Sequence, residues 1–220
     1  AVSYLYYADR VYQINLAIAG IAVGTVSLPV LSKAFKTKNQ KKISKIQNKS
    51  FELSLLLSVP ASLGLILASE EIVNALFGYG SFSKDDVALT AEALKYFGFG
   101  VPAFALVKIL SNFYFARDNT KTPFYISMFI VILNIFISVS LFSKIGFIII
   151  PIATSISTWI GVLIYLYLLN LKKALLLKNQ LIFNFIKILV STILMSLVLL
   201  FALDSYANYL EYFYKYKALY

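Results

Sequence analysis

Residues 3–24, SYLYYADRVYQINLAIAGIAVG, have the length and apolar character of a membrane-spanning helix, yet they carry Asp9 and Arg10 side by side. A helix needs about 20 apolar residues to cross the hydrocarbon core of a bilayer. A charged side chain at that depth costs roughly 2.5–3.5 kcal/mol on insertion scales, so it normally faces a partner or a wet cavity. This segment therefore predicts a membrane protein with a polar feature inside it.

The rest of the chain repeats this apolar character. Of its 220 residues 60% are hydrophobic, and they fall in continuous blocks separated by short polar loops. Continuous blocks favour helices over the strands of a lipid-facing β-barrel, which would alternate in hydrophobicity with a period of two. We predict an all-α polytopic membrane protein of about six transmembrane helices, at 4–30, 51–69, 92–115, 124–143, 146–169 and 181–203.

The net charge of +10 is concentrated in alternate loops. Loop 33–49 holds seven lysines and no acid, and loops 117–121 and 170–179 are also basic, whereas segment 69–86 holds four acids and one lysine. By the positive-inside rule the basic loops are cytoplasmic, which places the N-terminal end and the C-terminal tail on the external, periplasmic side. We interpret run 33–49 as a solvated loop attracted to anionic lipid, not as a nucleic-acid site.

Cysteine and histidine are absent from the sequence. Disulfides, thiol nucleophiles, imidazole bases and the commonest zinc ligands are therefore excluded. No Walker-type phosphate loop occurs either, so we expect no cofactor, and transport driven by a sodium or proton gradient, by the membrane potential or by a partner. A membrane enzyme acting on a lipid-linked substrate is a weaker alternative, because its acids would all come from segment 69–86.

Asp9 and Arg10 point about 100° apart on a helix, so they cannot share one face. Spacings of three and four place Arg10 beside Tyr6 and Gln13, and Asp9 beside Tyr12 and Gln13. A permanently charged guanidinium suits a phosphate or carboxylate ligand. From these residues, two interpretations are equally supported: a ligand-binding strip of Arg10, Asp9 and Gln13, or a structural ion pair with another helix.

Other residues inside the spans favour helix packing. Gly20 and Gly24 form a small face that allows another helix to approach closely, and Pro102 permits a bend in the third span. Asn134, Ser138 and Thr154 would offer oxygen ligands to a small cation if the fourth and fifth spans face each other. Hydrogen bonding between helices is the commoner role of such residues.

Four motifs carry a resemblance to a known family: YYADRVYQ (6–13), GIAVGTVSLPVLSK (20–33), LFGYGSFSKDD (76–86) and NFYFARDNTKTPF (112–124). In order and spacing they resemble the MurJ/MviN lipid II flippases of the MOP transporter superfamily, and the resemblance covers nearly the whole chain. It implies a fourteen-helix protein of the bacterial inner membrane. Such a protein moves lipid II, the undecaprenyl-pyrophosphate-linked peptidoglycan precursor, to the outer leaflet by alternating access between two six-helix lobes.

The resemblance aligns the chain with helices eight to thirteen of that family. Residues 1–169 would be second-lobe core helices of a MOP/MATE-like transporter, and 170–220 an extra helix with an external tyrosine-rich tail. We expect a C-terminal portion that is inactive alone, with lipid II, membrane lipids and a missing N-terminal lobe, or a separate chain supplying it, as partners. A polysaccharide-lipid flippase or a cation-coupled exporter of the same superfamily is the alternative.

The resemblance also implies roles for the polar residues. The arginine of the YADR motif belongs to the family's cationic central cavity, and its match here is Arg10, with Asp9 beside it and Gln13 one turn along. Some relatives couple to sodium through oxygens that match Asn134 and Thr154. Ser138 stands where an acid would help such a site most.

Overall fold

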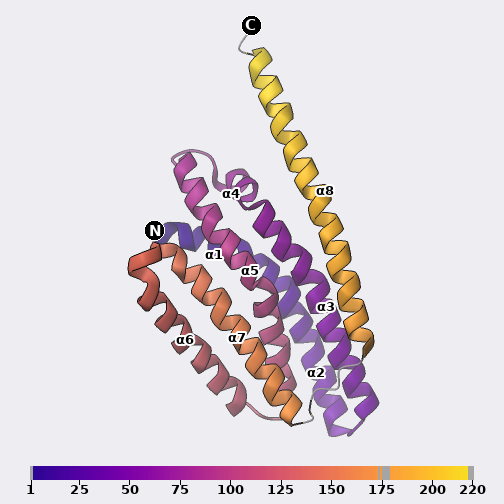
Figure 1. Cartoon of the computed structure of the whole chain (residues 1–220). Helices are drawn as coiled ribbons and strands as arrows, with labels where there is room; N and C mark the ends of the chain where they lie inside the picture. The colour runs from indigo at the N-terminus through magenta and orange to yellow at the C-terminus, as the bar shows by residue number, and fades with distance from the viewer. Residues whose placement is uncertain (1, 173, 175–178, 218–220) are drawn as a thin grey trace.

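The computed structural model describes residues 2–172, 174 and 179–217, and in these residues every regular element is a helix (Figure 1). The all-α prediction is confirmed. The elements are α1 Val2–Leu16, the π-helical η1 Ala17–Ala22, α2 Val23–Lys36, α3 Gln40–Leu67, α4 Ser69–Phe77, α5 Lys84–Phe115, α6 Lys121–Ile145, the short 3₁₀ turn η2 Gly146–Ile148, α7 Ile149–Leu171 and α8 Asn179–Lys217.

Five continuous helical stretches of the described chain are long and apolar enough to span a membrane: Val2–Lys36, Gln40–Leu67, Lys84–Phe115, Lys121–Leu171 and Gln180–Tyr206. The fourth contains both α6 and α7, because the chain reverses direction at Gly146, whose φ of 77° suits glycine. Helices α6 and α7 therefore run antiparallel (Figure 1). The described chain thus has six apolar helices at the positions of the six predicted spans.

Several predicted boundaries differ from the structure. Helix α3 begins at Gln40, eleven residues before the predicted span, because Asn39 caps its N-terminus. Residues 40–49 of the predicted loop are therefore helical.

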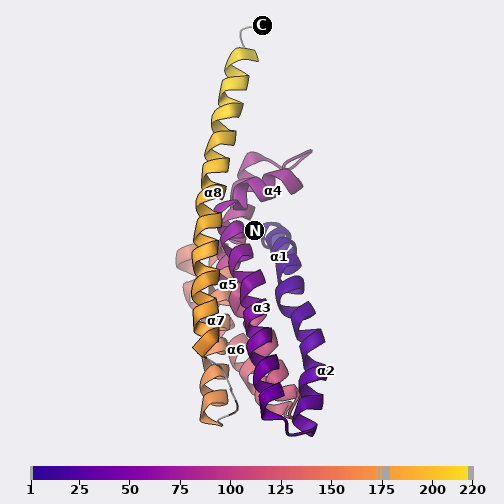
Figure 2. The ribbon, with the colours of Figure 1, turned by 90° about the vertical axis from the view of Figure 1, so that its right-hand side faces the viewer.

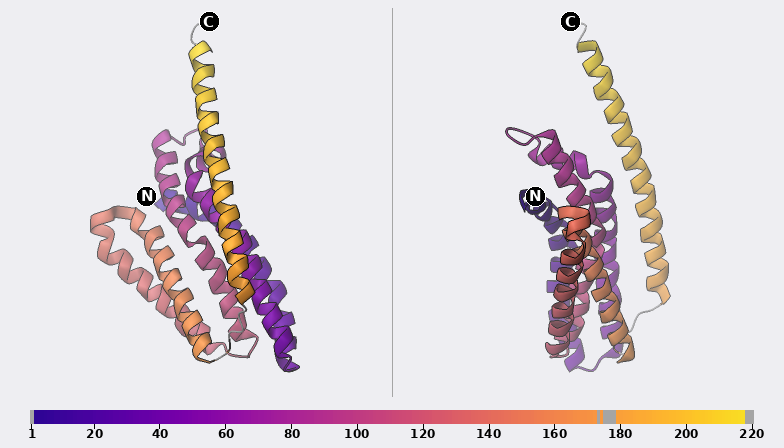
Figure 3. Two further views of the ribbon diagram at one scale, coloured as in Figure 1. Left: turned by 45° about the vertical axis from the view of Figure 1, so that its right-hand side comes forward. Right: turned by 60° about the vertical axis from the view of Figure 1, so that its left-hand side comes forward.

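Helix α5 begins at Lys84, eight residues before the predicted span, because Ser83 and Asp86 form a capping box at its N-terminus. The segment after residue 203, predicted as a separate tail, continues α8 to Lys217. At 1.5 Å per residue α8 is roughly 58 Å long, well beyond the ~30 Å hydrocarbon core. It projects past the other helices (Figures 1 and 3).

Helix α5 is the centre of the bundle. In its most apolar window 72% of the residues are buried, against 11% for α8. Two clusters of buried side chains lie along it, one containing Leu110, Phe113 and Tyr165, the other containing Leu94 and Phe97. Lipid tails are as apolar as these side chains, so helix association in the membrane depends on close packing and hydrogen bonds.

Gly20 and Gly24 allow the first span to approach α5 closely, as their spacing predicts. A Cβ atom at Gly20 would lie 3.1 Å from the Cα of Ala105, and one at Gly24 would lie 2.9 Å from Nδ2 of Asn112. Asn112 also donates a hydrogen bond of 2.9 Å to the Gly24 carbonyl. The π-helical segment η1, which contains Gly20, accompanies a change of direction between α1 and α2 (Figures 1 and 2).

Pro102 interrupts the hydrogen bonds of α5, and neighbouring helices compensate. Proline has no N–H, so the carbonyl of Gly98, four residues earlier, loses its helical donor. Ser62 of α3 donates to that carbonyl at 2.7 Å. On α7, Ser155 donates to the Tyr96 carbonyl at 2.8 Å and Trp159 donates to the Phe99 carbonyl at 3.0 Å. Helices α3 and α7 thus form hydrogen bonds with α5 at the stretch where proline interrupts its own backbone hydrogen bonding.

The Ser62 hydrogen bond should be worth more when proline occupies position 102. Ser62→Ala leaves the buried Gly98 carbonyl without a donor and should destabilise the full chain by about 1–3 kcal/mol. In a Pro102→Ala background the new N–H of residue 102 serves that carbonyl, so the same substitution should cost much less. Thermal unfolding of the four chains of this cycle in detergent tests the coupling, and equal costs in both backgrounds would contradict it.

Gly20→Ala with Gly24→Ala should separate α1 and α2 from α5. The added methyl groups meet the backbone of Ala105 and the side chain of Asn112, and overpacking of this kind costs about 1–3 kcal/mol. Gly64→Ala is the matched control, since a Cβ there meets nothing within 4 Å. The midpoint of thermal unfolding should fall for the double variant and not for the control. A double variant as stable as Gly64→Ala would disprove the close contact.

Candidate functional site

Arg10 lies on the exposed side of α1. Its Nη2 donates to the Tyr6 hydroxyl at 3.0 Å, and its Cζ lies 4.8 Å from the centroid of the Tyr6 ring. Asp9 accepts a hydrogen bond from Gln13 instead. Both pairs have the predicted spacing of four. Within the described residues no carboxylate lies at ion-pair distance from Arg10, and the contacts of its guanidinium are with the neutral Tyr6.

The packing of α1 on α5 explains why Arg10 points outward. Ala8 and Val11 are buried, and Tyr12 stacks on Phe97 with ring centroids 4.7 Å apart. The ring of Tyr12 also lies beside that of Phe104, with the two centroids 5.3 Å apart. Residues two positions apart on a helix point about 200° away from each other. Because Tyr12 points toward α5, Arg10 points away from it. These aromatic contacts were not predicted, although the heptad spacing of 97 and 104 on a helix was a signal for them.

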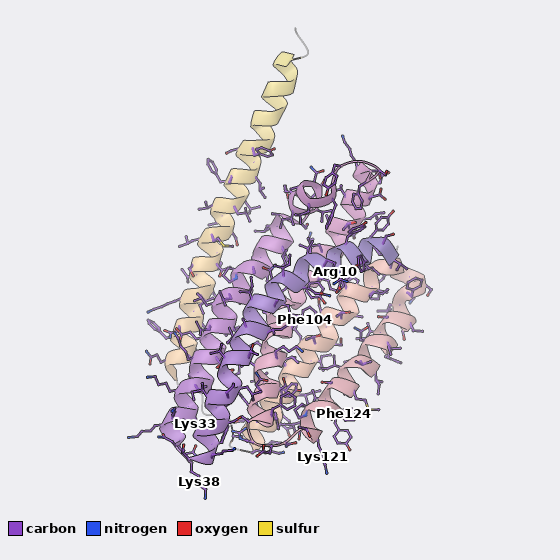
Figure 4. All side chains as sticks on the ribbon, turned by 180° about the vertical axis from the view of Figure 1, so that it is seen from behind. Arg10, Lys33, Lys38, Phe104, Lys121 and Phe124 are labelled. Carbon is purple, nitrogen blue, oxygen red and sulfur yellow. The ribbon has the colours of Figure 1, made fainter. Side chains whose placement is uncertain are left out.

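The face that carries Arg10 also carries lysines (Figure 4). In this view Arg10 lies in the upper half of the bundle and Phe104 lies below it, near the middle. Lys33 and Lys38 lie at the far end of α2, and Lys121 lies at the start of α6. All of these basic side chains are exposed. The first span borders one side of the face and α6 borders the other, with α5 and α7 between them.

A pocket of about 740 Å³ opens between α5, α6 and α7 at the lysine-rich end of the bundle. Its described lining includes two lysines and no acid, with hydroxyl and amide groups around them: Lys108, Lys121, Ser111, Asn112, Tyr125 and Ser127. The volume is in the range of small-ligand sites, and the lining suits an anion. Lys108 lies within the third predicted span, and the structure places it in this pocket. No pattern in the sequence connects it with Lys121.

The structure brings Asn134, Ser138 and Thr154 together between α6 and α7. Asn134 donates to the Thr154 hydroxyl at 2.9 Å and accepts from Ser138 at 3.2 Å. Thr154 donates to the Ile150 carbonyl at 2.7 Å. This geometry matches the interhelical hydrogen-bond interpretation. The described residues contain no cluster of three acidic, histidine or cysteine ligands, and a sodium site here stays a prediction.

Arg117 of the NFYFARDNTKTPF motif has a structural position. It donates to the carbonyls of Ala174 at 2.6 Å and Phe113 at 3.2 Å, and it lies over the ring of Phe35. Burial lowers the pKa of its guanidinium, which nonetheless keeps its charge at neutral pH. Gln47 donates to the same Ala174 carbonyl at 3.1 Å. Arg117 therefore ties Ala174, shortly after the end of α7, to α5 and α2.

Comparison with known proteins agrees with this arrangement. A family model described as lipid II flippase MurJ matches residues 1–219. A probable lipid II flippase MurJ of Rickettsia prowazekii is 40% identical over 168 residues, covering 76% of this chain and 33% of the relative. One of Thermotoga maritima is 36% identical over 160 residues, covering 71% of this chain and 32% of the relative.

A solved structure is also similar. A lipid II flippase MurJ in an inward closed conformation superimposes with a TM-score of 0.79 at 29% sequence identity, over 91% of this chain and 41% of that one. The chain spans about a third of the length of the curated relatives it matches. Together with its apolar helices, the relatives identify a multi-pass protein of the bacterial inner membrane. The chain belongs to the lipid II flippase MurJ family.

Proposed function

We propose that this chain forms part of a transporter, not an enzyme, which moves lipid II across the inner membrane by alternating access. The family match over residues 1–219 is the observation that carries the proposal. The missing walls of the cavity come from an N-terminal lobe, on the same or a separate chain, which covers the face in Figure 4. An alternating-access cavity needs both walls, so this chain is inactive alone.

Arg10 receives the pyrophosphate of the lipid-linked substrate. Its guanidinium offers several N–H donors in a plane that matches phosphate oxygens. The absence of an acid partner among the described residues leaves that charge available for an anionic ligand. Asp9 and Gln13 hold each other one turn away, so Asp9 accepts from an amide and does not neutralise Arg10.

Lys108 and Lys121 attract the same headgroup at the cytoplasmic mouth. The turn between α2 and α3, the start of α6 and the C-terminal end of α7 lie at the lower end of the bundle in Figure 1, and basic residues are concentrated there. This supports a cytoplasmic location for this end and an external one for the N-terminal end and the end of α8. Positive charge at the mouth raises the local concentration of an anionic lipid head. The headgroup then passes from these lysines to Arg10 as the lobes move.

The chain divides by role near residue 170. Residues 1–169 form the core of the second lobe, whose helices pack around α5. Residues 170–220 add α8, which packs mainly against α3 at the edge of the bundle (Figure 3). No cofactor takes part, and an ion gradient or the membrane potential drives the cycle.

Arg10→Ala in a complete protein containing this chain should weaken lipid II binding roughly 10- to 100-fold, since charge-assisted hydrogen bonds are worth about 1.5–3 kcal/mol. Arg10→Lys should restore part of the loss, because it keeps the charge but not the planar donors. Lys144→Ala, in the last turn of α6, is the control. Binding measured in nanodiscs that is unchanged by Arg10→Ala, with a lower unfolding midpoint, would assign Arg10 a structural role.

Lys108→Gln with Lys121→Gln should slow flipping in the same complete protein more than it weakens binding at Arg10. Removing two charges from the mouth lowers attraction over distance, and this attraction is screened by salt. The rate for the unmodified protein should therefore fall as NaCl rises, and the double variant should show a flatter dependence. If the flipping rates of the unmodified protein and the double variant fell equally steeply with NaCl, these lysines would not steer the substrate.

A further inference from the structure

A second pocket, of about 780 Å³, lies between the first half of α3 and the start of α8. Figures 1 and 2 show these two helix segments side by side at the edge of the bundle. The pocket shares no lining residue with the Arg10 strip or with the pocket that contains Lys108. It therefore needs an explanation separate from the transport site.

Three lysines of α3 line this pocket in a single row. Lys41, Lys45 and Lys49 are spaced by four residues, so they lie on one face of the helix. Glu52, the acid in the described lining, pairs with Lys49 at 3.8 Å. Lys41 and Lys45 have no acid in the lining to balance them. The pocket consequently has an excess of positive charge.

The start of α8 contributes the opposite wall. Gln180 and Asn184 bring carboxamide groups to the pocket, and Leu181 packs on the core cluster of the bundle. A carboxamide donates through its N–H groups to phosphate oxygens and accepts through its carbonyl oxygen from glycerol hydroxyls. The two walls together combine ammonium charges with neutral donors around a space large enough for a lipid headgroup.

Apolar surface continues from the pocket toward the middle of the membrane. The seam between the helices closes above it, where Ile188 and Thr192 of α8 are buried. The outer flanks stay exposed, at Leu56 of α3 and at Ile182 and Ile186 of α8. A ligand with a polar head in the pocket can therefore lay acyl chains on these flanks, but it cannot insert them between α3 and α8.

We infer that this pocket binds the headgroup of an anionic phospholipid of the cytoplasmic leaflet and thereby helps to hold α8 against α3. Basic pockets between transmembrane helices on the cytoplasmic side select anionic headgroups. A zwitterionic headgroup adds a cation of its own, which the lysines repel. The inference depends on the orientation of the chain but not on the substrate that is flipped.

The test uses the full chain in neutral detergent with dioleoylphosphatidylglycerol or dioleoylphosphatidylcholine added. A lipid that binds the folded state raises the unfolding midpoint in proportion to its affinity. Phosphatidylglycerol should raise the midpoint, and phosphatidylcholine should not. The variant K41Q/K45Q/K49Q should lose most of that increase. K33Q/K36Q/K38Q, which removes the same charge from the end of α2 and its following turn, should keep it.

A photoreactive phosphatidylglycerol locates the site independently of stability. Its cross-links, mapped by mass spectrometry, should fall in 40–52 and 180–184 in the unmodified chain and disappear in K41Q/K45Q/K49Q. Glu52→Gln provides a second variant if the triple substitution impairs folding. It frees Lys49 from its acid partner and should increase cross-linking.

Several outcomes would overturn the inference. If both triple variants lost the phosphatidylglycerol-induced increase in midpoint equally, the lipid would be attracted only by overall charge. If phosphatidylcholine raised the midpoint as much as phosphatidylglycerol, the pocket would have no headgroup selectivity. Suppression of cross-linking by millimolar inorganic phosphate would indicate a soluble-anion site. Reduced cross-linking in Glu52→Gln would show that the acid, not the lysines, holds the ligand. Each of these results leaves the proposal for Arg10 unaffected.

Discussion

Backbone carbonyls in a hydrocarbon environment need donors, and this requirement organises the bundle around α5. Pro102 removes a helical donor, and Ser62 of α3 supplies a replacement to Gly98. Ser155 and Trp159 of α7 donate to neighbouring carbonyls of the same stretch. Asn112 of α5 donates in turn to Gly24 of the first span. One helix is thereby tied to three others without relying on the hydrophobic effect, which is weak between apolar surfaces in lipid.

The same ties determine which side of the first span is left for function. Gly20 and Gly24 bring the span against α5, and Tyr12 stacks on Phe97. Arg10 then has to face away from the core, onto the surface that Figure 4 shows between α1 and α6. A charge on that surface is expensive in lipid and inexpensive beside water. Because the packing of a few small and aromatic residues turns Arg10 outward, its charge requires a wet cavity and a second lobe that covers it.

Much of this arrangement could be predicted from the sequence because it depends on the length of the apolar blocks and on the spacing of residues along a helix. The apolar blocks identified the six helices, the spacing of Gly20 and Gly24 identified a contact face, and the spacing of four identified the partners of Asp9 and Arg10. The predicted end of the last helix at residue 203 was wrong, since α8 continues to Lys217. Nothing in its sequence marks a helix stop such as glycine or proline there.

The contacts that were missed join residues far apart in the chain. Ser62 and Gly98, or Lys108 and Lys121 across two helices, have no local pattern that connects them. A serine in a span is common, and only the fold shows that it serves a carbonyl freed by proline. Tertiary partners of this kind decide both the stability of α5 and the charge of the pocket.

The most direct test of a wet Arg10 introduces a single thiol, and this sequence contains no cysteine that would compete with it. Any cysteine in the rest of the complete protein is first replaced by serine. Arg10→Cys in a complete protein in membranes should react with a charged, membrane-impermeant thiol reagent. It should react about as fast as Ser81→Cys in the loop before α5, and an undecaprenyl-pyrophosphate-linked substrate should slow it. A thiol at position 10 as inert as one at the exposed apolar position Val139 would place Arg10 against lipid and contradict the proposed cavity.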